Sequence, residues 1–198
     1  VKISEDEKKT HVGNNANGRR KEPFDGERRV VIAMQKSQKA YVDTPDMKMR
    51  ECADEVLKEL DGETDFILVN FLSSDMMKHT GSFEAAKKSN EITDVQVGRI
   101  KEKVDKIKED IVSQMRQEIE SLPSAVSKLL LPFFKDYAEG YNAEGFLNVL
   151  KGIDSGVYQK IKDLEAKIPI FVVIADHGAS EDGLKANQKE SDNFHTAN

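Results

Sequence analysis

The sequence predicts an α/β fold in which a mostly parallel sheet is flanked by helices and interrupted by a helical insertion. Two apolar runs with little polar alternation, residues 66–71 and 170–174, are typical of strands that are covered on both faces. Several helical patterns lie between them, and strand, helix, helix and strand in this order favour a parallel sheet. With 198 residues, of which 38% are hydrophobic, the chain is long enough for one domain or a large part of one.

The N-terminal part of the chain carries the weakest signals. Residues 1–28 are polar and favour a loop or a weak edge strand, whereas the apolar residues 29–33 predict a short strand. Thr44 as an N-cap, followed by Pro45 in the first turn, predicts the start of a helix. Apolar residues then recur at helical spacing as far as a stop signal at Gly62.

Three helical patterns occupy the middle of the chain. The first has an apolar stripe over residues 97–122, in steps of three and four. The second covers residues 126–137 and contains Pro132, where a kink is expected. The third covers residues 146–164. We interpret residues 101–168 as a helical insertion, because this stretch is longer than the crossover between two parallel strands requires.

The composition disfavours several classes of partner. The formal net charge of −6 argues against nucleic acid, because proteins that bind it are usually basic. No apolar run approaches the roughly 18 residues that span a bilayer and no secretory signal opens the chain, so we expect no membrane partner. The single cysteine, Cys52, excludes an internal disulfide and favours a reducing, cytoplasmic setting.

Three of the four histidines stand in distinctive places. Two of them follow an aspartate that comes after an apolar run, and the third lies near the last residue. Asp75 and His79 are four apart, so a helical turn there places both side chains on one face. Asp176 and His177 follow the second run, beyond which ligands collect in open α/β sheets. His195 is the third. The first pair alone also fits a capping aspartate and a surface histidine, and the other two are weak signals by themselves, but together they predict a site for a divalent metal such as Mn, Zn or Fe.

The residues around these positions form longer motifs. The first reads Asp75-Met76-Met77-Lys78-His79-Thr80-Gly81, and the second reads Ala175-Asp176-His177-Gly178. The third reads His195-Thr196-Ala197-Asn198. Upstream stand Glu7-Lys8-Lys9-Thr10-His11, Glu22-Pro23-Phe24-Asp25-Gly26-Glu27 and Tyr41-Val42-Asp43-Thr44-Pro45-Asp46-Met47. In this order the motifs resemble the cofactor-independent (2,3-bisphosphoglycerate-independent) phosphoglycerate mutases of the alkaline phosphatase superfamily.

The resemblance implies a cytoplasmic glycolytic isomerase that interconverts 3-phosphoglycerate and 2-phosphoglycerate through a phosphoserine. It also implies two divalent metal ions, Mn first, with Zn, Co or Fe as alternatives. By motif, Asp75, His79 and His195 would bind one ion, and the Asp-His pair of the second motif would bind the other. Lys8 would hold the phosphoryl group. Two such cations can bind both the attacking and the leaving oxygen of a phosphoryl transfer, and a lysine neutralises charge on the transferred group.

The resemblance covers only part of the family's chain. The family's serine nucleophile and a further aspartate ligand lie upstream, and nothing here matches them, so we expect missing sequence before Val1. Residues 1–100 and 169–198 would then form the second half of a metal-binding phosphatase domain with a partial alkaline-phosphatase-like sheet. The mutase activity would belong to the complete protein, or to a complex in which another part supplies the missing half and phosphoglycerate is the substrate.

Two other functional classes stay open. One is a non-catalytic, mainly helical interaction module with vestigial metal motifs, whose apolar stripes bind a partner helix. The same stripes also fit an ordinary core within the chain. The other is a different metal phosphatase or phosphopentose mutase of the same superfamily. The context of the first motif and residues 22–27 favour the glycerate enzyme.

Overall fold

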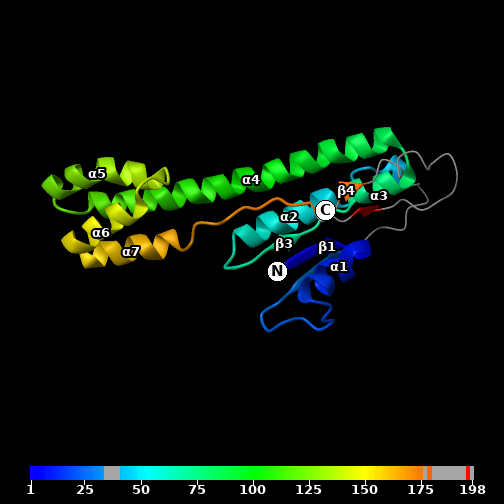
Figure 1. Ribbon diagram of the computed structural model, residues 1–198, viewed down its shortest axis with the longest axis horizontal. Coiled ribbons are helices and arrows are strands. Elements are labelled where there is room, and N and C mark those ends of the chain that lie inside the picture. Colours follow the sequence, from blue (N-terminus) through cyan, green and yellow to red (C-terminus); the bar gives the residue numbers. More distant parts are fainter. Residues whose placement is uncertain (34–40, 176–177, 180–194, 197–198) are drawn as a thin grey trace. The chain divides into compact units, whose positions relative to one another are not determined.

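The computed structural model describes residues 1–33, 41–175, 178–179 and 195–196 (Figure 1). It divides into two compact units, unit 1 with Val1–Lys103 and Val173–Asn198 and unit 2 with Val104–Val172. The assignment of these regions to a phosphatase domain and an insertion stays a prediction. Among the described helices, none is both long and apolar enough to cross a membrane.

Unit 1 is built on a three-stranded parallel sheet with the strand order β2-β1-β3 (Figure 1). The central strand β1 (Lys2–Glu5) pairs with β2 (Arg29–Ile32) along its whole length and with β3 (Leu68–Val69) at its first two residues. Helices pack against this sheet, so the predicted α/β class with a parallel sheet is confirmed.

The position of β1 corrects the expectation of a loop or weak edge strand for residues 1–28. All four residues of β1 are buried, although only Ile3 is apolar. The amine of Lys2 lies 3.5 Å from the carboxylate of Glu27 and donates a hydrogen bond to Asn17. Strands on both sides satisfy the backbone and nearby side chains satisfy the charge, so a polar segment occupies the centre of the sheet.

The helices of unit 1 surround the strands and the loops between them. They are η1 (Asp6–Lys8), α1 (Lys9–Gly13), η2 (Asn15–Asn17), η3 (Tyr41–Asp43), α2 (Met49–Leu60), α3 (Ser73–Thr80) and the first part of α4 (Phe83–Glu120). The apolar face predicted for α2 is buried, with Met49, Cys52 and Ala53 fully inaccessible. The predicted start of this helix at Thr44 is wrong, because α2 begins at Met49. The backbone N–H groups of Thr44 and Met47 donate hydrogen bonds within two successive turns that precede the helix.

The predicted strand at residues 170–174 is wrong, and the run at residues 66–71 forms only the two residues of β3. Ile170 is 90% exposed and Ile174 is 80% exposed. A strand needs a neighbour that completes its backbone hydrogen bonds. Within the described part of the chain, no strand of the three-stranded sheet pairs with this segment. Its apolar, β-branched composition alone therefore does not produce a strand.

Unit 2 is helical and contains the end of α4, α5 (Ser124–Ala138), α6 (Ala143–Ile153) and α7 (Ser155–Glu165). Each helix contributes apolar side chains to one core, with Met115, Ile119, Leu130, Phe134, Tyr137, Phe146, Leu150 and Ile161 among them. Pro132 lies inside α5. The apolar stripes of the three predicted patterns thus supply the interior of this unit.

The third helical pattern, predicted as one helix over residues 146–164, is two helices. Asp154 has an extended backbone conformation and follows the last residue of α6. Its carboxylate accepts hydrogen bonds from the backbone of Gly156 at 2.9 Å and Val157 at 3.0 Å, and so caps α7. Capping by an aspartate outweighs the helical periodicity, which continues across the break.

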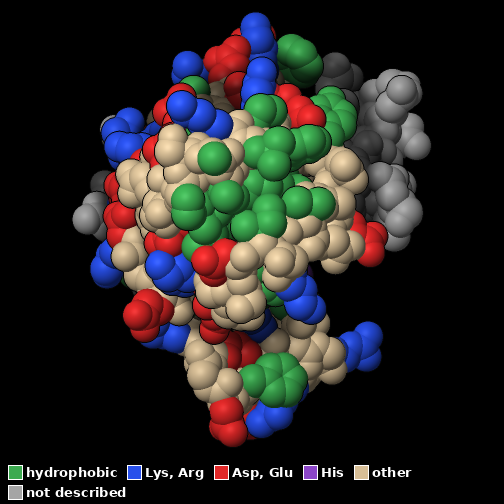
Figure 2. All heavy atoms as spheres, turned by 90° about the vertical axis from the view of Figure 1, so that its left-hand side faces the viewer, with side chains coloured by type: hydrophobic (Ala, Val, Ile, Leu, Met, Phe, Trp, Pro, Cys, Tyr) green, Lys and Arg blue, Asp and Glu red, His purple; other side chains and the backbone are tan. Residues whose placement is uncertain are grey.

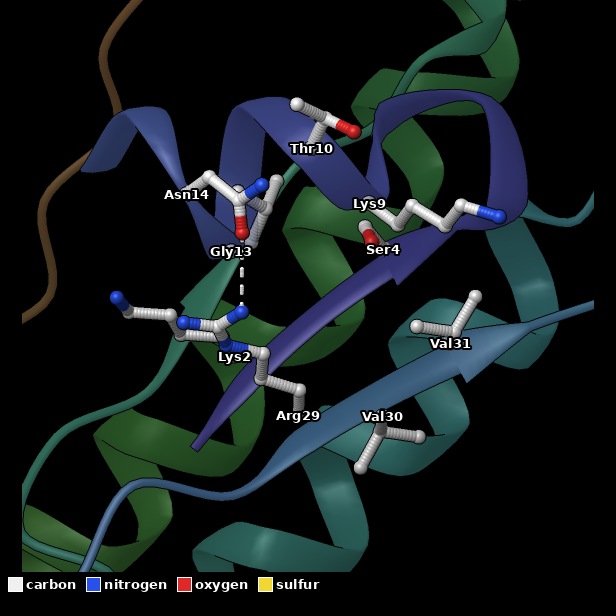
Figure 3. A pocket seen from close by; sticks show the side chains of 10 residues that line it. Lys2, Ser4, Lys9, Thr10, Gly13, Asn14, Arg29, Val30 and Val31 are labelled. Carbon is white, nitrogen blue, oxygen red and sulfur yellow. Dashed lines mark hydrogen bonds between the residues drawn. The ribbon is translucent and has the colours of Figure 1, made fainter. Parts of the chain in front are cut away.

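Gly13 marks a close approach between α1 and the sheet (Figure 3). A Cβ atom at this position would lie 3.0 Å from Nη1 of Arg29. The guanidinium of Arg29 is fixed, since Nη1 donates to the Asn14 side chain at 3.1 Å and to the Lys21 carbonyl at 2.8 Å. Its Nε also donates to Glu27 at 2.6 Å. Glycine therefore fits position 13 because the neighbouring side chain is held in place.

We expect Glu5→Gln to make stability less dependent on pH. Glu5 is fully buried, and burial raises the pKa of its carboxyl to about 7. The backbone N–H of Lys48 opposes the shift, whereas the charges of Glu7 and Glu51 add to it. Because the folded state holds the proton more tightly, the stabilising effect of protonation is present below the unfolded pKa and is lost as pH rises through about 7.

The free energy of unfolding of Glu5→Gln relative to wild type should rise by on the order of 2 kcal/mol from pH 5 to pH 8. Urea unfolding of both proteins at the two pH values measures this change. Glu7→Gln is the matched control, because Glu7 is exposed. An equal difference between wild type and Glu5→Gln at the two pH values would contradict the buried ionisation.

A candidate metal centre at the carboxyl edge of the sheet

Helix α3 carries two of the predicted ligands and is fixed at both ends. The buried hydroxyl of Ser73 donates to the Pro45 carbonyl and accepts a hydrogen bond from Ser89 at 2.9 Å. Gly81 ends the helix with a left-handed backbone conformation. Met77 is buried in a small apolar cluster with Met47, Leu72 and Ala85. These contacts hold the helix between the turn before α2 and the start of α4.

Asp75 and His79 lie on one face of α3, as their spacing predicts. The Nε2 atom of His79 is 3.5 Å from Oδ1 of Asp75. The side chain of Asp75 is 19% exposed and that of His79 is 36% exposed. The pair therefore places a largely buried carboxylate beside a partly exposed imidazole.

Lys8 reaches the same place from a different part of the chain. It is the last residue of η1, which directly follows β1. Its ammonium lies 3.0 Å from Oδ2 of Asp75, and its side chain is only 11% exposed. The structure thus brings together three residues that the motifs singled out, and one aspartate contacts both an ammonium and an imidazole.

The remaining predicted ligands stand in the C-terminal part of the chain. Asp176 and His177 lie outside the described residues. The next two residues form β4 (Gly178–Ala179), which pairs antiparallel with β5 (His195–Thr196). In this pairing Ala179 is the partner of His195. The start of the third motif therefore runs beside Gly178, the last residue of the second motif, and Ala179.

The donor set fits part of a metal site. The carboxylate of Asp75 and the imidazole of His79 are donor types that bind Mn and Zn. In the part of the chain that the structure describes, no group of three or more His, Cys, Asp and Glu side chains is placed to hold a metal ion. The ammonium of Lys8 lies beside the Asp75 carboxylate. Asp75 and His79 thus lie together on α3, and the other predicted ligands, which the family resemblance implies, belong to the second and third motifs.

Two buried polar groups near this site escaped the sequence analysis. Oδ1 of Asn70, one residue beyond β3, and Nζ of Lys78, on α3 between the two predicted ligands, are buried. Neither has a hydrogen-bond partner among the described residues. A polar residue within the apolar run at residues 66–71 is a signal that would have identified Asn70. No local pattern indicates that Lys78 is buried.

The cleft in Figure 3, about 290 Å³ in volume, is a separate feature. It lies between α1 and the strands β1 and β2, and three basic residues, Lys2, Lys9 and Arg29, line it. None of Lys8, Asp75 and His79 lines this cleft. The candidate site is therefore not this cavity.

Comparison with known proteins agrees with a metal-dependent class. Residues 1–113 match the family model described as Metalloenzyme superfamily. The chain belongs to the Metalloenzyme superfamily. The match includes Lys8, Asp75 and His79 but ends before the second and third motifs.

The curated relatives carry a more particular name. Over 108 residues the chain is 40% identical to the 2,3-bisphosphoglycerate-independent phosphoglycerate mutase of Pseudomonas putida, a match that covers 54% of this chain and 21% of the relative. Over 105 residues it is 43% identical to a protein of the same name from Clostridium botulinum, covering 52% and 20%. The matched stretch spans about a fifth of these relatives. The resemblance drawn from the motifs is confirmed.

We expect the Lys8–Asp75 pair to couple energetically. Asp75→Asn leaves the buried ammonium of Lys8 without this carboxylate, and should destabilise the fold by about 2 kcal/mol. Lys8→Met combined with Asp75→Asn should recover part of that loss, because no buried charge then remains unpaired. Urea unfolding of the two single variants and the double variant measures the coupling.

The exposed pair between Lys9 and Asp6, 2.8 Å apart, is the matched control. Asp6→Asn should cost less than about 0.5 kcal/mol, because both side chains are more than half exposed. Additive effects of Lys8→Met and Asp75→Asn would show that the buried pair contributes no more than an exposed one.

Proposed function

We propose that this chain is the metal-binding part of a 2,3-bisphosphoglycerate-independent phosphoglycerate mutase, which interconverts 3-phosphoglycerate and 2-phosphoglycerate through a phosphoserine. The convergence of Lys8, Asp75 and His79 carries the proposal. The names of the curated relatives and the order of the motifs support it. The reacting serine and the glycerate site would come from a part of the complete protein beyond these 198 residues.

Asp75 and His79, together with His195, would bind one divalent ion, and Asp176 and His177 would bind a second. Manganese suits this mixed set of carboxylate and imidazole donors. A bound ion supplies positive charge that stabilises the transferred phosphoryl group. The helix fixes two of the donors one turn apart, so binding requires little reorganisation of their backbone.

The ammonium of Lys8 has a role separate from that of the metal ligands. Lys8 is held against Asp75, a proposed ligand, so its ammonium would lie beside the bound ion. An ammonium there neutralises part of the negative charge on a phosphoryl group during transfer. Because the Lys8 side chain is largely buried, its charge is weakly screened by solvent and acts more strongly than that of an exposed lysine.

Calorimetric titration with Mn²⁺ tests the metal site. The wild-type chain should bind Mn²⁺, and His79→Ala should weaken binding by about 10-fold or more, because one of the few donors is lost. His11→Ala is the matched control, since His11 lies on α1, is exposed and belongs to no proposed ligand set. It should leave the affinity unchanged.

Equal Mn²⁺ affinities of wild type, His79→Ala and His11→Ala would contradict the proposal that α3 binds a metal ion. That outcome would favour the alternative of an interaction module with vestigial metal motifs. Testing for mutase activity requires the complete protein, in which Lys8→Ala should lower turnover strongly and Lys9→Ala should not.

A further inference from the structure

Helices α5 and α6 expose apolar side chains in addition to those that they bury. Leu129 and Phe133 on α5 are 61% and 54% exposed, and Val149 and Ile153 on α6 are 53% and 43% exposed. We call these four residues the outer α5–α6 face. Figure 2, which looks at the end of unit 2, shows hydrophobic side chains gathered in one patch. None of the four belongs to the buried core of this unit or to the partly buried residues packed against that core.

The two rows of this face lie side by side. The rings of Tyr137 and Phe146 are in contact, with 4.9 Å between their centroids, so the sides of α5 and α6 that carry them face each other. Phe133 and Leu129 precede Tyr137 by one and two turns, about 40° and 80° around α5 from it, so they border the side that faces α6. On α6, Ile153 and Val149 lie about 20° and 60° around the helix from Phe146 in the matching direction and border the side that faces α5. The four side chains therefore form one continuous strip.

The size of the strip suits an interface. From the exposed fractions, it presents on the order of 400 Å² of apolar surface, which is within the range of patches that are often functional. A stable interface buries about 800 Å² on each partner, with an apolar centre and a polar rim. The strip supplies about half of that area, and the residues around it can supply the rest.

The exposed charges on α5, on α6 and directly after α5 balance, with Lys128, Lys135 and Lys151 against Asp136, Glu139 and Glu144. The exposed neighbours Ala125, Pro132, Asn148 and Gly152 are uncharged. Lys128 and Asp136, both exposed, lie on α5 four residues before and four residues after Pro132. The face is therefore neutral, whereas the whole chain carries a formal charge of −6. A second copy of the chain would meet this face without the repulsion that the net charge produces elsewhere.

We propose that the outer α5–α6 face binds the same face of a second copy about a two-fold axis near Pro132. In such an isologous contact the two α5 helices run antiparallel. Lys128 of each copy then meets Asp136 of the other, because the two residues are equally far from Pro132 on opposite sides. The apolar strips cover each other at the centre. This inference is independent of the metal site and of the proposed catalytic role.

Sedimentation equilibrium of the full chain tests the proposal. The wild type should have twice the 22.2 kDa mass of one chain. Phe133→Lys should raise the dimer dissociation constant about 30-fold or more, because a central anchor is lost from both copies. Val95→Lys is the matched control, since Val95 on α4 is 58% exposed and lies outside the strip. It should leave the dimer intact.

Charge reversal distinguishes a specific contact from misfolding and from nonspecific association. Lys128→Glu should weaken the dimer about 10-fold at low salt, and the double variant Lys128→Glu with Asp136→Lys should restore it. Circular dichroism should show equal helix content in all variants. A wild type that stays monomeric at about 100 μM would overturn the proposal and point to another occupant of the strip. A dimer that Phe133→Lys leaves unchanged, or a double variant that stays weak, would also overturn it.

Discussion

The parallel pairing of β1 with β3 determines where the functional groups of unit 1 meet. Parallel strands end at the same edge of a sheet, so the segments that follow them start close together. Beyond β1 the chain turns into η1, which carries Lys8, and beyond β3 it leads into α3, which carries Asp75 and His79. Two residues of backbone pairing thus bring together groups that are far apart in the sequence.

The same edge concentrates buried ionisable groups. Glu5 at the end of β1 is fully buried, and Lys8 and Asp75 are largely buried against each other. A purely structural sheet of this size would gain more from apolar residues at these positions, since burying a charge has a desolvation cost even when it is paired. Ionisable groups that persist at the carboxyl edge of a parallel sheet are typical of a ligand site. The energetics and the family membership therefore point in the same direction.

Local rules predicted some features well and others poorly. The i, i+4 spacing of Asp75 and His79 was enough to place them on one helix face, and the apolar periodicity identified the buried side of α2. The contact between Lys8 and Asp75 depends on strand order, which no local pattern contains, and only the family resemblance anticipated a shared site. The apolar run at residues 170–174 failed as a strand because pairing requires a neighbour. The exposure of Leu129 and Phe133 depends on how many helices surround α5, which periodicity alone does not determine.

The contact between Gly13 and Arg29 also has an evolutionary consequence. Asn14, the Lys21 carbonyl and Glu27 hold the guanidinium in place, so this side chain has little freedom to retreat from a larger residue at position 13. A substitution at either position is then tolerated best after a change at the other. Among homologous sequences, the two sites should covary, with a shorter side chain at position 29 wherever position 13 has gained a Cβ atom.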